Sequence, residues 1–125
     1  MRTKIHIKEA SIRNNELLLQ PDEIFEGSNY IAKEQVLADS DHQAFIYLIE
    51  ENDEYTYISL PESIWSFLCI AIKKNYPVLI ASEETKFELN GIVEELIALL
   101  ENIKGNSNYG EAFTVKVEQV FTECR

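Results

Sequence analysis

The fold is decided by residues 101–111, ENIKGNSNYGE, which lie between two apolar segments of helical periodicity. Three asparagines, two glycines, a serine and a tyrosine make this stretch rich in residues that end or begin helices. Gly105 predicts the end of one helix, because glycine most easily adopts the left-handed conformation past a helix C-terminus. Asn108 and Glu111 have the spacing of a capping box and predict the start of the next helix.

The segments on either side predict two C-terminal helices, which we expect to pack as an antiparallel or angled pair. Asn90 is a favourable N-cap for the first of them. Apolar side chains recur at spacings of three and four, which places them on one side of each helix. They are Ile92, Val93, Leu96, Ile97, Leu99, Leu100 and Ile103 in the first helix, and Tyr109, Phe113, Val117, Val120 and Phe121 in the second.

The N-terminal residues predict a β-hairpin. Ile5 and Ile7 alternate with polar residues, and Asn14-Asn15 supplies a turn before a second strand at 17–19. Residues 21–33 lose this alternation and gather proline, glycine, serine and asparagine, so we expect a loop there, with a short helical turn at 22–25.

Residues 36–59 predict three strands in a meander, with polar turns at 39–41 and 51–54 between them. The strand at 44–49 is an apolar and β-branched run, which is typical of a buried strand. In the last strand the side chains alternate between two faces. Tyr55, Tyr57 and Ser59 share one face, and Thr56 and Ile58 share the other.

A helix and a strand pair follow the meander. Ser59-Leu60-Pro61-Glu62 has the pattern of a capping box with proline in the first turn, and it predicts a helix that runs to about Lys74. Trp65 is the largest side chain of its apolar stripe, which we expect to pack flat on the sheet. Residues 76–80 and 85–89 predict two further strands, joined by a polar turn.

These segments predict one α+β domain over residues 1–125, in which a mainly antiparallel sheet of about five to seven strands packs against three helices. The expected parts are an N-terminal hairpin and loop (1–34), a strand meander (35–60), a helix (61–75), a strand pair (76–89) and two C-terminal helices (90–122).

Charge is the unusual bulk property, since 22 acidic and 11 basic residues give a formal net charge of -11. Nucleic-acid surfaces need clustered lysine and arginine, so we expect no nucleic-acid partner. The excess of carboxylates is typical of a soluble monomer, and it also suits a basic protein partner.

The N-terminus lacks the continuous apolar run of a signal peptide, and no apolar run is long enough to span a bilayer. We therefore expect a cytoplasmic protein with no membrane association. Cys69 lies in an apolar helical pattern and Cys124 lies next to the last residue. Their spacing suggests no pairing, so we expect two free thiols.

Sequence motifs for catalysis or cofactors are absent, and we expect no cofactor. The histidines and cysteines lack the spacing of zinc ligands, and the glycines form no phosphate-binding loop. No nucleophile has a catalytic signature, so the sequence leans against an enzyme. The alternative site is the turn of Asp39, Asp41 and His42, which offers two carboxylates and an imidazole for a divalent cation; its simpler interpretation is an Asx-type turn.

The candidate binding surface is the connector of the two C-terminal helices. Tyr109 lies beside asparagines there, and an aromatic ring with neighbouring amides can contact a peptide. The alternative interpretation is a plain helix-to-helix connector. The candidate residues are Asn102, Asn106, Asn108, Tyr109 and Glu111.

The strings DSDHQAFIY, YISLPESIW and LLENIKGNSNYGE, followed by VEQVF, resemble the uncharacterised YjbL-like family of small proteins from low-GC Gram-positive bacteria. The resemblance covers roughly Val36 to Phe121 and leaves out the N-terminal hairpin. It implies a bacterial cytosolic single-domain protein, and it implies no activity, cofactor or catalytic residue.

Three functions follow as hypotheses. The leading one is a non-enzymatic protein-interaction or regulatory module whose partner is another protein. The second is a small metal-assisted enzyme that uses Asp39, Asp41 and His42. The third is an acidic inhibitor or immunity-like protein that masks a basic partner.

Overall fold

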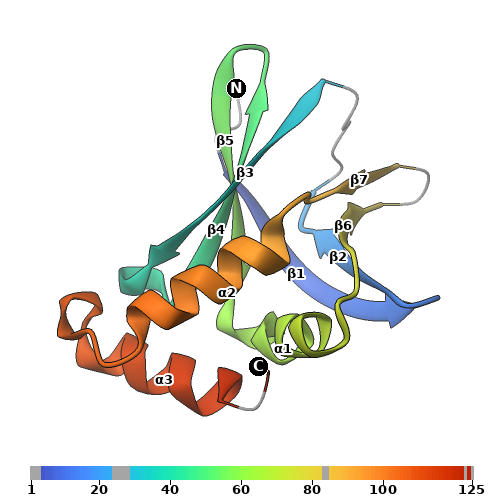
Figure 1. Ribbon diagram of the computed structural model, residues 1–125. Helices are drawn as coiled ribbons and strands as arrows, with labels where there is room; N and C mark the ends of the chain where they lie inside the picture. Colours follow the sequence, from blue (N-terminus) through green and yellow to red (C-terminus); the bar gives the residue numbers. More distant parts are fainter. Residues whose placement is uncertain (1–3, 24–28, 83–84, 123, 125) are drawn as a thin grey trace.

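The computed structural model describes residues 4–23, 29–82, 85–122 and 124, which form the predicted α+β fold (Figure 1). The strands are β1 (Lys4–Arg13), β2 (Glu16–Pro21), β3 (Tyr30–Asp39), β4 (Ala44–Glu51), β5 (Glu54–Pro61), β6 (Val78–Ala81) and β7 (Lys86–Glu88). The helices are α1 (Trp65–Lys74), α2 (Ile92–Ile103) and α3 (Glu111–Phe121), with 3-10 turns η1 (Ser40–His42), η2 (Glu62–Ile64) and η3 (Ser107–Tyr109).

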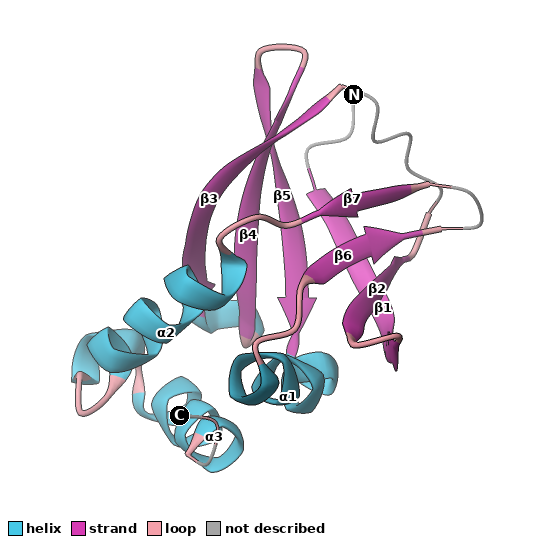
Figure 2. Ribbon diagram, turned by 45° about the vertical axis from the view of Figure 1, so that its right-hand side comes forward, coloured by secondary structure: helices cyan, strands magenta, loops and turns pink. Residues whose placement is uncertain are grey.

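The strands form one seven-stranded sheet in the order β3-β4-β5-β1-β2-β6-β7. The meander β3-β4-β5 is antiparallel, as predicted, and so are the pairs β1–β2 and β6–β7. Two pairs are parallel, β1 with β5 and β2 with β6. The N-terminal hairpin therefore lies in the middle of the sheet, between the meander and the β6–β7 pair (Figures 1 and 2).

The hairpin has the turn that its sequence predicts. Asn14 and Asn15 both have positive φ, 52° and 63°, as a two-residue hairpin turn requires. A register shift between Ile7 and Glu9 adds one residue to β1. The bulge returns Ala10 to the side that Ile7 faces, so the alternation of the sequence shifts by one residue without exposing the core.

The sheet curls until its two outermost strands approach each other. The rings of Tyr30 in β3 and Phe87 in β7 meet edge-on with centroids 5.5 Å apart. A bulge between Ala32 and Val36 bends β3, and Glu34 within it has a φ of 52°. Its side chain lies against Gly91, where an added Cβ would be 2.8 Å from the Glu34 Oε1 atom.

Tyr47 fastens the central strand β4 to the start of α2. Its ring is fully buried, and its hydroxyl donates a hydrogen bond of 2.6 Å to the carbonyl oxygen of Asn90. Burial raises the pKa of Tyr47 to about 12, because the phenolate would be poorly solvated there.

Four aromatic rings form the base of the core, where α1 and α3 meet the sheet. Phe45 of β4 lies 5.0 Å from Trp65 of α1, and both rings contact Phe113 and Phe121 of α3 at centroid distances of 5.7 to 5.9 Å. The Trp65 indole N–H donates to the Leu60 carbonyl at 3.0 Å, which satisfies its buried polar atom. This aromatic cluster holds both helices on one face of the sheet.

The predicted helix caps were wrong. Ser59 is a residue of β5, paired with Ile46, and α1 begins only at Trp65 after the turn η2. The strand extends to Pro61 because Ser59 and Leu60 continue the ladder with β4. Ladder hydrogen bonds along the whole strand outweigh one capping hydrogen bond.

The second helix also begins elsewhere than predicted. Gly91 is the N-cap of α2 with a φ of 75°, and Asn90 instead offers its carbonyl to Tyr47. Gly110, not Asn108, is the N-cap of α3, because Asn108 lies in the turn η3. The helix ends were predicted better, since α1 ends at Lys74 and α2 ends two residues before Gly105.

The loop predicted at 21–33 was too long. Pro21 belongs to β2, and residues 30–33 are the first part of β3, where Tyr30 and Ile31 pair with Glu51 and Glu50. The helical turn predicted at 22–25 lies partly outside the described residues, and Asp22 and Glu23 form a bend.

The prediction of two free thiols was wrong, because the two cysteines form a disulfide. Cys69 of α1 and Cys124, beyond the end of α3, are bonded with their Cα atoms 5.1 Å apart. The sequence separation of 55 residues concealed the pairing, because packing of α3 against α1 is what brings the two together.

Replacing Phe113 by Ala should lower the free energy of unfolding by about 3–5 kcal/mol, since it opens a cavity among the four rings. The matched control is Val115→Ala on the same helix, where the side chain is 45% exposed and the loss should stay within about 0.5 kcal/mol. Urea titration of both variants measures the difference. Equal losses would contradict the central place of the aromatic cluster.

Tyr47→Phe should change the response to alkali. The unfolded chain loses this proton near pH 10 and the native protein near 12, so the native state binds more protons between these values and its stability falls as pH rises. The slope from this group is about 1.4 kcal/mol per pH unit, and the variant should lack it. At pH 7 the variant should lose about 0.5–1.5 kcal/mol for the missing hydrogen bond. Parallel stability curves from pH 9 to 12 would refute the assignment.

Candidate functional site

The connector between α2 and α3 brings its predicted residues together, but mostly to bond one another. The Tyr109 hydroxyl donates to Asn102 Oδ1 at 2.6 Å, and the Asn108 backbone N–H donates to Asn106 Oδ1 at 3.0 Å. Tyr109 is half-buried and its ring lies 6.4 Å from Phe113. These contacts make the segment a well-ordered connector.

Part of the connector still faces solvent. Asn102, Asn108 and Glu111 are exposed, and Glu111 begins α3. Gly105 and Gly110 have φ values of 69° and 87°, which allow the two sharp changes of direction. Hydrogen bonds within the connector occupy several of its polar groups. Its role as a binding surface stays a prediction.

The Asp39 to His42 turn brings two of its three predicted residues together. His42 Nδ1 lies 3.0 Å from both carboxylate oxygens of Asp39, and Lys4 Nζ lies 3.8 Å from Asp39 Oδ2. Asp41 is exposed, and the left-handed Gln43 ends the turn with a φ of 48°. Among the described residues, no three His, Cys, Asp or Glu side chains are grouped to hold a metal ion.

A larger candidate surface lies on the outer face of β3, β4 and β5. The register places Ile31, Glu50 and Tyr55 in one row across the three strands, and Leu37 opposite Ile46 in another. Side chains of paired residues point to the same face of a sheet. We define the outer-sheet patch as the apolar residues of this face, Ile31, Leu37, Ile46, Leu48, Tyr55 and Tyr57.

None of the described helices contributes to this face. The core lies on the opposite face, where Phe45, Tyr47 and Ile49 alternate with the outward residues of β4. Ile46 and Leu48 are buried, yet they lie outside the core cluster because neighbouring side chains of the patch cover them. The larger side chains around them are exposed, with fractions of 53% for Ile31, 39% for Leu37, 53% for Tyr55 and 41% for Tyr57.

Charged groups surround the outer-sheet patch. Lys33 Nζ lies 3.5 Å from Glu50 Oε1. This ion pair neutralises the Glu50 carboxylate, which lies in the same row as Ile31 and Tyr55. The turn beyond it carries Glu51, Asp53 and Glu54, of which the last two are exposed. These acidic groups lie at the tip of the β4–β5 hairpin, where Asp53 has positive φ, and Glu54 points to the opposite face from Tyr55. The patch therefore has an apolar, tyrosine-rich centre and an acidic tip.

The sequence predicted only part of this patch. The alternation at 55–59 placed Tyr55 and Tyr57 on one face, and the structure shows both exposed. Ile31 was missed because the predicted loop at 21–33 includes it. The signal that was present is the pair of apolar residues Tyr30 and Ile31 next to Ala32, which continues the strand before Val36.

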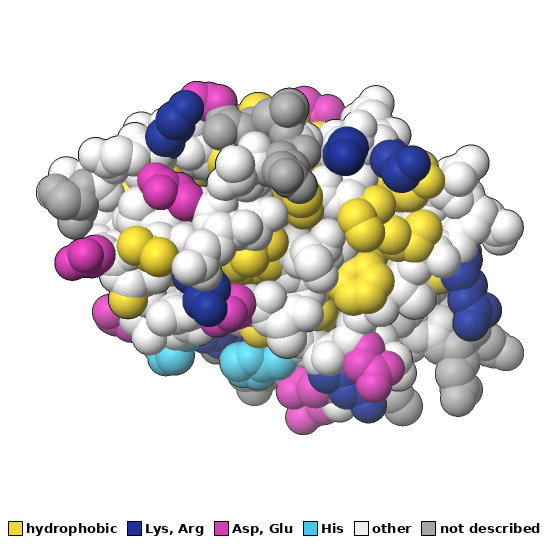
Figure 3. Space-filling model, turned by 90° about the horizontal axis from the view of Figure 1, so that it is seen from below, with side chains coloured by type: hydrophobic (Ala, Val, Ile, Leu, Met, Phe, Trp, Pro, Cys, Tyr) yellow, Lys and Arg dark blue, Asp and Glu magenta, His cyan; other side chains and the backbone are white. Residues whose placement is uncertain are grey.

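The helical side of the molecule has a different surface. Seen from below, hydrophobic side chains gather right of centre and lie beside lysine or arginine side chains (Figure 3). The partly exposed apolar residues of α1 include Phe67, Cys69 and Ile70, and its last turn ends in the exposed Lys73 and Lys74. Acidic side chains are more scattered on this face.

Comparison with known proteins places the chain in a family. The model of a family of unknown function, UPF0738, matches residues 5–121. The chain belongs to UPF0738. This confirms the predicted membership in an uncharacterised family from low-GC Gram-positive bacteria, and the match also includes the N-terminal hairpin, which the resemblance left out.

UPF0738 relatives in Bacillus align with nearly the whole chain. A UPF0738 protein of Bacillus licheniformis is 41% identical over 121 residues, and one of Bacillus velezensis is 40% identical over 121 residues. A relative in Bacillus mycoides is 35% identical over 122 residues. Each alignment covers 97% of this chain and 99% of the relative. No solved structure matches the chain. Within the described residues, no helix is long and apolar enough to cross a membrane.

The connector gives a prediction about backbone conformation. Gly105→Val should lower stability by about 1–2 kcal/mol, because a β-branched residue is strained at a φ of 69°. Gly105→Asn is the matched control, since asparagine tolerates this conformation and no atom lies within 4 Å of an added Cβ.

Tyr109→Phe tests the hydrogen bond of the same connector. It should cost within about 1 kcal/mol, because only the partly exposed contact with Asn102 is lost. Thermal melting of the variant measures the loss. A loss of several kcal/mol would show that Asn102 and Tyr109 are a main structural contact of the fold.

Proposed function

We propose that the protein is a non-enzymatic interaction module of the cytoplasm, which binds a basic protein through the outer-sheet patch. The observation that carries the proposal is the uncovered apolar face of β3, β4 and β5. An exposed apolar patch of this kind, edged by polar groups, is characteristic of protein-interaction surfaces.

The residue types of the patch favour a protein partner. Tyr55 and Tyr57 lie on alternate positions of one strand and extend from a rigid sheet, so little conformational entropy is lost when they are covered. Tyrosine provides both apolar area and a polar hydroxyl, and it is enriched in binding interfaces. Ile46 and Leu48 form a packed floor beneath them.

The charge of the molecule favours a basic partner. The net charge of -11 attracts cationic surfaces at a distance, and the acidic tip at Asp53 and Glu54 places negative charge at the end of the hairpin that carries Tyr55 and Tyr57. A basic enzyme bound in this way would have its surface masked, which is the inhibitor or immunity-like form of the same proposal.

The test is capture of partners by tagged protein from Bacillus lysate, followed by affinity measurement with the purified partner. The test variant is Tyr55→Ser with Tyr57→Ser, and the control is Val115→Ser, which removes an equally exposed apolar side chain on α3. Loss of two central aromatic contacts should weaken binding about 30-fold or more, while the control stays near wild type. Circular dichroism must show all variants folded.

Salt and a connector variant separate the alternatives. Binding to a basic partner should weaken as salt rises from 50 to 500 mM, because the acidic tip is screened. An Asn106→Ala, Tyr109→Ala variant that alone loses the partner would transfer the site to the connector. A partner that is acidic, or one that binds the Tyr55→Ser, Tyr57→Ser variant as well as wild type, would refute the proposal.

A further inference from the structure

We propose that the Cys69–Cys124 disulfide is a reversible thiol–disulfide switch that controls how firmly the end of α3 is held against α1. The inference concerns the helical side of the molecule and goes beyond binding at the outer-sheet patch. It rests on where the bond lies, on the partial exposure of Cys69, and on the aromatic cluster next to it.

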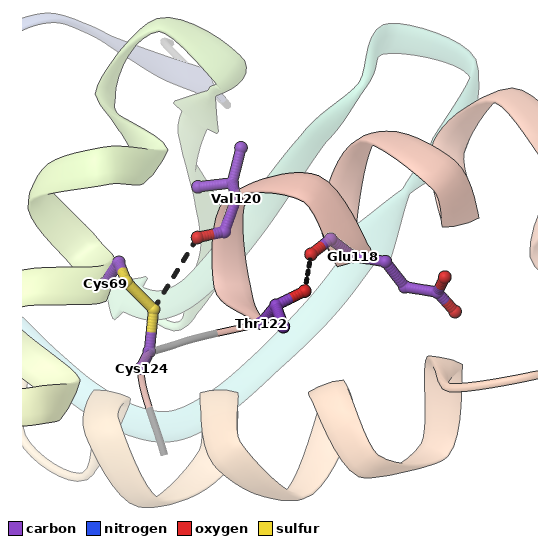
Figure 4. The surroundings of a disulfide bond; sticks show 5 residues. All are labelled: Cys69, Glu118, Val120, Thr122 and Cys124. Carbon is purple, nitrogen blue, oxygen red and sulfur yellow. Dashed lines mark hydrogen bonds between the residues drawn. A yellow bond between two sulfur atoms is a disulfide. The ribbon is translucent and has the colours of Figure 1, made fainter.

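The disulfide is the covalent tie of the chain beyond α3. Figure 4 shows Cys69 projecting from α1 toward Cys124, which follows the last turn of α3. Cys124 is buried and belongs to the core cluster. Its other described ties are weak, a 3.3 Å hydrogen bond from its N–H to the Phe121 carbonyl and a 3.7 Å contact of Sγ with the Val120 carbonyl.

The two cysteines differ in exposure. Cys124 is buried, whereas Cys69 is partly exposed on the helical side, where Phe67 and Ile70 are also partly exposed. A thiolate must reach a disulfide sulfur in line with the bond, so access decides the rate of exchange. Attack at Cys69 therefore releases Cys124 as the leaving thiolate.

The reduction is balanced with a dithiol as the reductant. One thiolate of the dithiol attacks Cys69 Sγ, breaks the bond to Cys124 and forms a mixed disulfide; the Cys124 thiolate takes up a proton. The second thiolate of the reductant then displaces Cys69 and closes a cyclic disulfide. Two electrons pass to the protein, which gains two thiols, and the dithiol is oxidised. A peroxide or an oxidised low-molecular-weight disulfide reverses the change.

Reduction of the disulfide affects the core through α3. Phe121 lies three residues before Cys124 and its ring contacts Trp65 and Phe45, so the tail that the bond holds is next to the aromatic cluster. Cys69 is one helical turn after Trp65 in α1. Reduction removes the covalent constraint at this corner and leaves the burial of a small side chain and the weak contacts with Phe121 and Val120 to hold Cys124. The last turn of α3 should then open more often.

The chain offers no competing thiol, because its only two cysteines form this bond. Disulfides in reducing compartments are transient, whereas those in oxidising compartments persist. For a cytoplasmic protein, as proposed above, the bond would follow the redox state of the cell. The switch itself can be measured on purified protein, independently of any partner.

The test uses the full chain equilibrated at pH 7 with buffers of graded reduced to oxidised dithiothreitol. Alkylation and mass spectrometry count the thiols, and amide hydrogen exchange follows residues 115–122. Trp65, the only tryptophan, reports the same change by fluorescence. We expect full, reversible conversion without denaturant, with exchange in the last turn of α3 about tenfold faster when reduced.

The control is the Cys69→Ser, Cys124→Ser variant, which should behave as the reduced protein and show no response to dithiothreitol. A second variant, Cys69→Ser alone, separates loss of the bond from loss of a buried thiol. Two thiols that stay free under oxidising buffer would overturn the proposal, and so would a bond that resists native reduction. Exchange at 115–122 that is equal in both redox states would also overturn it.

Discussion

The contact of Phe45 with the three rings of Trp65, Phe113 and Phe121 is the interaction on which the rest of the structure depends. It joins a central strand to two helices that are far apart in sequence, and it closes the base of the core. Without this contact α3 would not pack against α1. The two cysteines would then not be brought together, and the connector would not take its position. The arrangement of the C-terminal third of the chain thus depends on one aromatic cluster.

A sheet whose described helices all lie on one face leaves the other face to be explained. Strand β4 places its largest apolar side chains inward, but β5 directs Tyr55 and Tyr57 outward, where a purely solvated face would carry polar residues. The tyrosines are consistent with a face that is covered part of the time. The acidic tip and the net charge favour a cationic protein as the cover.

Periodicity in the sequence predicted most of the elements, and local capping patterns predicted their starts poorly. The hairpin at Asn14-Asn15 and the helical stripe of Phe113 and Val117 follow from short-range chemistry. The helix start predicted at Ser59 was wrong because pairing with β4 decides where β5 ends, and that pairing is a tertiary contact. Contacts between distant segments, including Cys69 with Cys124, depend on topology that no local pattern encodes. The same limit applied to Ile31 of the outer-sheet patch.

The central position of the N-terminal hairpin has a consequence for biosynthesis. Ile5 pairs with Ile58 and Leu18 with Leu79, so the first two strands to leave the ribosome find their neighbours only after half of the chain has followed. Until then both long edges of the hairpin are open to pairing with other chains. A large share of the contacts in the fold joins distant segments, which slows folding. A nascent chain of this family therefore passes through an interval of aggregation risk, which ends when β5 and β6 occupy those edges.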